Sequence, residues 1–161
     1  SSVTAYVVQS QNPKISESFI SPTTFFNFPN FSLNSSAETK SPATKSSPIS
    51  ISAKENNWDD CLLLNTENKI IESSNSNLFI VKGDRIITPP ITDGCVDGTM
   101  RSFIKSQFDV HEKSITKEDL FSADEVFLSN AIEGVKWIES FEEKKYQSYK
   151  IARLVFNKLN T

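Results

Sequence analysis

Four groups of residues along the chain could do chemistry: Lys40, the acid Glu72, the segment Gly98-Thr99-Met100 and the pair Asn130-Ala131. A glycine that leads into a helix leaves the first backbone amides free, and these amides bind phosphate with help from the helix dipole. An ordinary loop before a helix gives the same pattern, and an isolated glutamate is most often a solvated carboxylate. The groups therefore gain meaning only if the fold brings them together.

Lys40 is the candidate for a covalent role. A lysine that is buried or close to other positive charge has a lowered pKa and becomes a nucleophile near neutral pH. Lys40 and Lys45 both precede Glu72 at a plausible distance, and Lys40 is the better placed. Pro48 disfavours a continuous helix after Lys40, since a proline in a helix interior costs about 3 kcal/mol. An exposed loop lysine is the alternative interpretation.

Short strands followed by helices are predicted around these residues. Apolar runs of strand length alternate with turn-forming residues, and Lys82-Gly83-Asp84 is typical of a tight hairpin turn. Thr116 and Asp119 have the spacing of a helix start. The predicted strands cover residues 61–65, 70–72, 77–81, 85–88 and 125–130, and the predicted helices cover residues 99–108, a segment after Thr116, and residues 145–159.

Composition excludes several classes of partner. The 161 residues include 17 Lys and Arg against 20 Asp and Glu, for a net charge of −3, so no broad basic surface is expected to bind nucleic acid or anionic lipid. Cys61 and Cys95 lack metal-site or disulfide spacing, and no metal is expected. No apolar run approaches the roughly 20 residues of a membrane span, and the first residues do not resemble a signal peptide. We therefore expect a cytoplasmic protein.

The chain divides near residue 50 into two stretches of different composition. Residues 1–50 are rich in Ser, Thr and Pro, whereas residues 51–161 have the pattern of a packed domain. Disordered segments are usually poor in aromatic residues. The first stretch is therefore predicted to be irregular but docked, with a flexible linker as the alternative. Its docking residues would be Phe19, Phe25, Phe26, Phe28 and Phe31.

Three segments in this order resemble one known family: IESSNSNLFIVKG (71–83), TPPITDGCVDGTMR (88–101) and ADEVFLSNA (123–131). They are similar to the class IV, or fold-type IV, pyridoxal-phosphate aminotransferases, which include branched-chain and D-amino acid aminotransferases and aminodeoxychorismate lyase. The resemblance implies an α/β fold in which a small N-terminal domain joins a larger C-terminal pseudo-barrel. On this resemblance, we expect the chain to supply mainly the C-terminal domain, with the N-terminal domain absent.

The resemblance implies that pyridoxal 5′-phosphate is the cofactor. Glu72 would then face the pyridine nitrogen and keep it protonated, which makes the ring an electron sink. Lys40 would be the catalytic residue that binds the cofactor covalently and later moves the substrate's α-proton.

The remaining cofactor-binding residues are also implied by the resemblance. Gly98, Thr99 and Met100 would contact the phosphate, although relatives often have threonine where Met100 stands, so a hydroxyl contact is lost. Asn130 and Ala131 would lie where a strand end closes over the phosphate and the substrate. Asparagine followed by a small residue is typical of the lyase branch.

Two reactions and one non-catalytic role follow as expectations. The enzyme would transfer an amino group between an amino acid and a 2-oxo acid, or eliminate pyruvate from aminodeoxychorismate to give 4-aminobenzoate for folate synthesis. A homodimer partner would complete the active site. The alternative is a non-catalytic fragment or degenerate relative that acts as a folding or association module.

Overall fold

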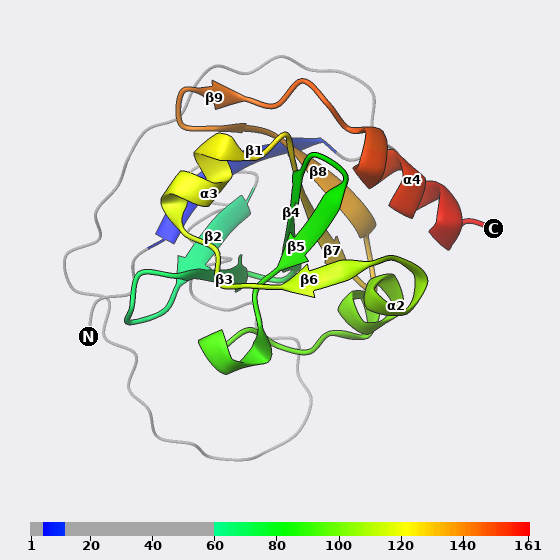
Figure 1. Ribbon diagram of the computed structural model, residues 1–161, viewed down its shortest axis with the longest axis horizontal. Helices are drawn as coiled ribbons and strands as arrows, with labels where there is room; N and C mark the ends of the chain where they lie inside the picture. The colour runs from blue at the N-terminus through cyan, green and yellow to red at the C-terminus, as the bar shows by residue number, and fades with distance from the viewer. Residues whose placement is uncertain (1–4, 12–59) are drawn as a thin grey trace.

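A strongly curled sheet of nine strands forms the centre of the computed structural model, which describes residues 5–11 and 60–161 (Figure 1). The strands are β1 Ala5–Gln11, β2 Asp60–Leu64, β3 Ile70–Ser73, β4 Asn77–Lys82, β5 Arg85–Thr88, β6 Val110–Glu112, β7 Glu125–Asn130, β8 Gly134–Phe141 and β9 Lys144–Lys145. The helices are η1 Ile91–Asp93, α2 Thr99–Gln107, α3 Lys117–Ser122 and α4 Lys150–Leu159.

The sheet closes on itself to form a barrel. The strand order is β3-β2-β1-β8-β7-β4-β5-β6, and β3 also pairs with β4, so β1, β2, β3, β4, β7 and β8 form a ring. Glu72 and Asn77 are the register pair that closes it. The ring is antiparallel throughout, and β5 and β6 extend the sheet from β4, with β6 parallel to β5.

Two apolar clusters pack on the two faces of the barrel wall. Leu78 and Ile80 of β4 belong to the inner cluster, while Phe79 and Val81 belong to the outer one, because side chains alternate along a strand. The rings of Phe79 and Phe127 stack with their centroids 5.0 Å apart. Helices α2 and α4 cover the outer cluster, and α3 adds to the inner one. Burial on both faces explains the continuous apolar run of β4.

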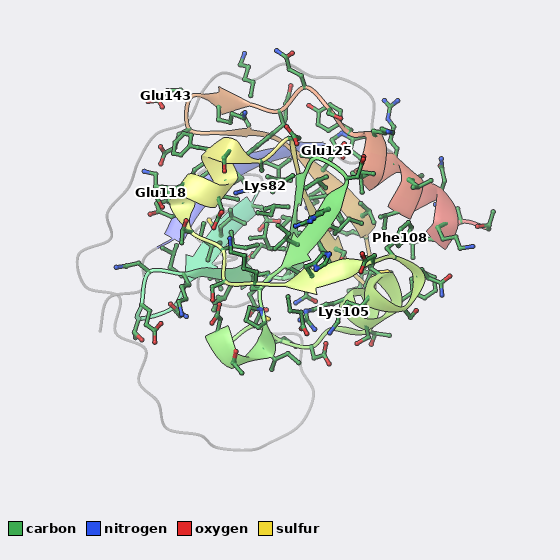
Figure 2. The ribbon with its side chains drawn as sticks, viewed as in Figure 1. Lys82, Lys105, Phe108, Glu118, Glu125 and Glu143 are labelled. Carbon is green, nitrogen blue, oxygen red and sulfur yellow. The ribbon has the colours of Figure 1, made fainter. Side chains whose placement is uncertain are left out.

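Helix α4 begins against a buried carboxylate of the barrel wall. Glu125, at the start of β7, accepts hydrogen bonds from the backbone N–H groups of Ile151 and Ala152 and from the Ser148 hydroxyl, at 2.8–3.1 Å (Figure 2). No side-chain cap comes from the N-cap residue Tyr149. Glu125 therefore satisfies amides that a helix start otherwise leaves free.

Several predicted elements are confirmed, with local differences. The strands beginning at residues 60 and 70, the hairpin of β4 and β5, strand β7 and the helix after Gly98 all form. Thr116 and Asp119 make the predicted reciprocal capping box. The last helix begins at Lys150 rather than at Lys145, because Lys144 and Lys145 pair with β8 as β9.

Strands β1, β8 and β9 were not predicted. Residues 5–11 fall within the stretch predicted to be irregular, yet they form β1 between β2 and β8. The rest of that stretch, including Lys40 and the phenylalanines proposed to dock it, lies outside the described residues. Across the ranges that the structure describes, no helix has the length and apolar character needed to cross a membrane.

Candidate functional site

The carboxylate of Glu72 lies against the loop that leads into α2. Its Oε2 accepts a hydrogen bond from the backbone N–H of Val96 at 2.9 Å. The side chain is partly buried, and this burial raises the pKa of Glu72 while the bond from Val96 opposes the shift. Glu72 is therefore joined directly to the glycine-containing loop 94–98, the segment that the sequence singled out as its partner.

Asn77 holds the same residue, Val96, from the neighbouring strand. It pairs with Glu72 in the register, and its Nδ2 donates to the Val96 carbonyl at 2.7 Å. A Cβ on Gly98 would lie 2.4 Å from Asn77 Oδ1, so only glycine fits here without a shift. Sequence reasoning missed Asn77 as a site residue, although a polar residue at the start of an apolar strand was a signal.

In the part of the chain that the structure describes, no side chain caps the N-terminus of α2. Gly98 is the N-cap residue in an extended conformation, and Thr99 beside it is exposed. Met100 packs against the outer apolar cluster, so its side chain offers no polar contact. The free backbone amides at this helix start and the helix dipole form an anion-binding arrangement next to Glu72.

Asn130 uses its side chain to build the turn between β7 and β8. Its Oδ1 accepts from the backbone N–H groups of Ile132 at 2.9 Å and Glu133 at 2.7 Å, and its Nδ2 donates to Ser76 Oγ at 2.8 Å and Glu133 Oε2 at 3.2 Å. Both of its amide N–H groups and its carbonyl are thus engaged. The bond to Ser76 brings the exposed Ala131 turn beside the turn between β3 and β4.

Charged residues line the inside of the barrel at the same end. Lys136 is the register partner of Leu128, whose side chain faces the interior, so Lys136 lies on the inner face too. The Lys136 Nζ lies 3.2 Å from Glu133 Oε2 and 3.7 Å from Asp60 Oδ2. Burial raises the pKa of Asp60, while Lys136 and nearby hydrogen bonds oppose the shift. Asp60 is buried and Lys136 is partly buried, and together they make one end of the barrel polar.

The structure thus brings Glu72, the start of α2 and the Asn130 turn to one end of the barrel. Lys40 lies outside the described residues, so its position relative to this site stays a prediction. Arg101, another residue missed at the sequence level, is fully buried and hydrogen-bonds Asp97 of loop 94–98. Within residues 5–11 and 60–161, no cluster of His, Cys, Asp or Glu could hold a metal ion.

Comparison with known proteins identifies the family. Residues 49–141 match the family described as amino-transferase class IV, and the chain belongs to this family. The curled sheet is the pseudo-barrel of the C-terminal domain in the fold-type IV enzymes, as the sequence predicted.

Individual relatives include both kinds of enzyme. The chain is 30% identical over 94 residues to a probable branched-chain-amino-acid aminotransferase of Aquifex aeolicus, covering 55% of this chain and 30% of that protein. It is 33% identical over 111 residues to an aminodeoxychorismate lyase of Vibrio harveyi, covering 63% of this chain and 41% of that protein. The branched-chain aminotransferase of Thermobaculum terrenum in its pyridoxal-phosphate form is 26% identical, with a TM-score of 0.61 over 71% of this chain and 40% of that chain. The chain therefore spans less than half the length of these relatives.

Proposed function

We propose that this chain is the cofactor-binding part of a pyridoxal-phosphate-dependent class IV aminotransferase. The observation that carries the proposal is the hydrogen bond between Glu72 and Val96, which joins an acid to the loop before a helix whose start no described side chain caps. A phosphorylated pyridine offers a ring nitrogen for the acid and a phosphate for the helix start. The residues present therefore fit the cofactor of the structurally similar Thermobaculum enzyme.

Each described residue has a separate task in this proposal. Glu72 pairs with the pyridine nitrogen through its carboxylate, and partial burial strengthens that pairing because less water competes for the charge. The amides that follow Gly98 hold the phosphate, and the exposed Thr99 adds a hydroxyl. Since the Asn130 side chain is engaged within its turn, the turn would offer backbone groups at Ala131. When bound, pyridoxal phosphate supplies an electron sink beside the amino-bearing carbon of the substrate.

Lys40 completes the proposed site as the residue that binds the cofactor covalently and transfers the α-proton. A nucleophilic lysine serves both tasks, because the same amine can accept a proton once it is free. A second copy of the chain is proposed to complete the active site, and analytical ultracentrifugation tests whether the chain forms the dimer that this requires.

The proposed reaction is amino transfer between an amino acid and a 2-oxo acid. Elimination of pyruvate from aminodeoxychorismate is the second candidate, supported by the Asn130-Ala131 pair and by the similarity to the Vibrio lyase. Product analysis separates the two, since only the lyase releases 4-aminobenzoate.

Cofactor addition tests the proposal. Pyridoxal phosphate should give an absorbance band near the visible edge, and borohydride followed by peptide mass spectrometry should fix the label on Lys40. Lys40→Ala should abolish the band, whereas Lys45→Ala, the matched control at the other candidate lysine, should keep it. A band that persists in Lys40→Ala refutes the role of Lys40. The absence of any band in the wild-type chain favours the non-catalytic module instead.

A further inference from the structure

Arg101 ties the start of α2 to three other parts of the chain. Its guanidinium is completely buried, which is rare for arginine. Nη1 donates to Asp97 Oδ1 at 2.6 Å, while Nη2 donates to the Pro89 carbonyl at 3.1 Å and to Glu112 Oε1. Pro89 follows β5 and Glu112 ends β6. The side chain therefore connects loop 94–98 to the outer edge of the sheet.

The loop is consequently held from two sides. From the barrel wall, Glu72 accepts from the Val96 N–H at 2.9 Å and Asn77 donates to the Val96 carbonyl at 2.7 Å. Arg101 donates a hydrogen bond to the next residue, Asp97, from the helix side. Because the amides at the start of α2 directly follow this loop, both sets of hydrogen bonds determine where those amides lie.

Charge gives Arg101 a second effect on the same amides. Asp97 directly precedes the N-cap residue Gly98, where its negative charge would compete with any anion for the helix dipole. Arg101 lies between Asp97 and Glu112 and offsets their charges. Lys105, which Figure 2 labels, also contacts Glu112, at 3.1 Å, but among the described residues no ion pair joins it to the loop.

We propose that Arg101 is a positioning residue for phosphate recognition, acting through loop 94–98 and never touching the ligand itself. A planar guanidinium serves several acceptors in fixed directions at once, which a lysine ammonium cannot do in the same way. This inference rests on the proposed function, because it assigns the loop to the phosphate group of pyridoxal phosphate.

Ligand pairs that differ only in the phosphate provide the test. Dissociation constants for pyridoxal phosphate and for pyridoxal are measured on the full chain and on its Arg101→Met and Lys105→Met variants. Arg101→Met should weaken pyridoxal phosphate binding by roughly tenfold to a hundredfold, the equivalent of losing one charged hydrogen bond. Pyridoxal binding should change by less than about twofold. Lys105→Met, which removes a cation from the same helix, should leave both constants unchanged.

Hydrogen exchange on the ligand-free proteins gives a readout that does not depend on the cofactor. The hydrogen-bonded amides of Gly94 and Val96 in the loop should exchange at least about tenfold faster in Arg101→Met, while those of β7 keep their protection. Equal weakening of both ligands, or loop protection that matches the wild type, overturns the proposal. If Arg101→Met fails to fold, Arg101→Lys takes its place with the same criteria. A wild-type chain that binds neither ligand contradicts the proposed function, and the exchange measurement then decides the role of Arg101 alone.

Discussion

Replacing Gly98 by alanine isolates the close contact between loop 94–98 and the barrel wall. The backbone of Gly98 has φ −66° and ψ 150°, which alanine adopts without strain, so backbone conformation does not require glycine here. The new Cβ would instead lie 2.4 Å from Asn77 Oδ1. Asn77 must then move, and its 2.7 Å hydrogen bond to the Val96 carbonyl is lost or weakened.

The expected cost follows from these contacts. The lost hydrogen bond contributes about 1 kcal/mol, the steric displacement costs about 1–3 kcal/mol, and alanine is a poorer N-cap than glycine by up to about 1 kcal/mol. Gly98→Ala should therefore lower the free energy of unfolding by about 2–5 kcal/mol, measured by urea denaturation. Thr99→Ala, at the exposed next residue, is the control and should change it by less than about 0.5 kcal/mol.

A double-mutant cycle gives the decisive comparison. Asn77→Ser shortens the side chain that the new Cβ would meet, so Gly98→Ala should cost at least about 1 kcal/mol less in the Asn77→Ser background than in the wild type. If the two substitutions simply add, or if Gly98→Ala is as stable as the wild type, then the contact with Asn77 is not the reason for glycine at this position.

Two further outcomes are expected elsewhere in the fold. Glu125→Gln removes the charge that accepts from the Ile151 and Ala152 amides, and it should destabilise the chain by about 1–3 kcal/mol and speed hydrogen exchange in α4; unchanged exchange in α4 would contradict this role. Burial raises the pKa of Asp60, so the folded chain binds the carboxyl proton more tightly than the unfolded chain does. The contribution of Asp60 to stability therefore falls as the pH rises from the ordinary aspartate pKa to the raised pKa. Asp60→Asn should remove this fall, and identical pH–stability curves above about pH 4 for the two proteins would refute the assignment.

Local signals in the sequence were enough to predict much of the fold. Helix α2 and the capped start of α3 were found because glycine, threonine and aspartate at fixed spacing define helix starts within a few residues. Strand β7 was found as an apolar run bounded by polar residues. In each case the information lies within about ten residues of chain.

The missed strands depend on partners that are distant in sequence. Strand β1 lies in a Ser- and Thr-rich stretch and becomes a strand by pairing with β2 and β8, more than 45 residues away. Strand β8 has Lys136 facing the barrel interior, which breaks the apolar alternation expected of an inner face. The buried pairing of Lys136 with Asp60 becomes apparent only once the barrel has closed.

The candidate site shows the same limit. Glu72 and Gly98 stood out through the family resemblance, whereas Asn77 and Arg101 act through contacts across strands and loops. One signal for Arg101 was present, since a cation in the first turn of a helix opposes the dipole and suggests local acidic partners. Choosing Asp97 and Glu112 as those partners required the three-dimensional arrangement.

One register pair, Glu72 with Asn77, closes the ring of strands. The side chains of the same two residues hydrogen-bond Val96. The strand pair that closes the barrel therefore also holds the loop of the candidate site in place. A ligand bound at this loop should therefore stabilise the whole ring of strands against unfolding, including the strands farthest from the ligand.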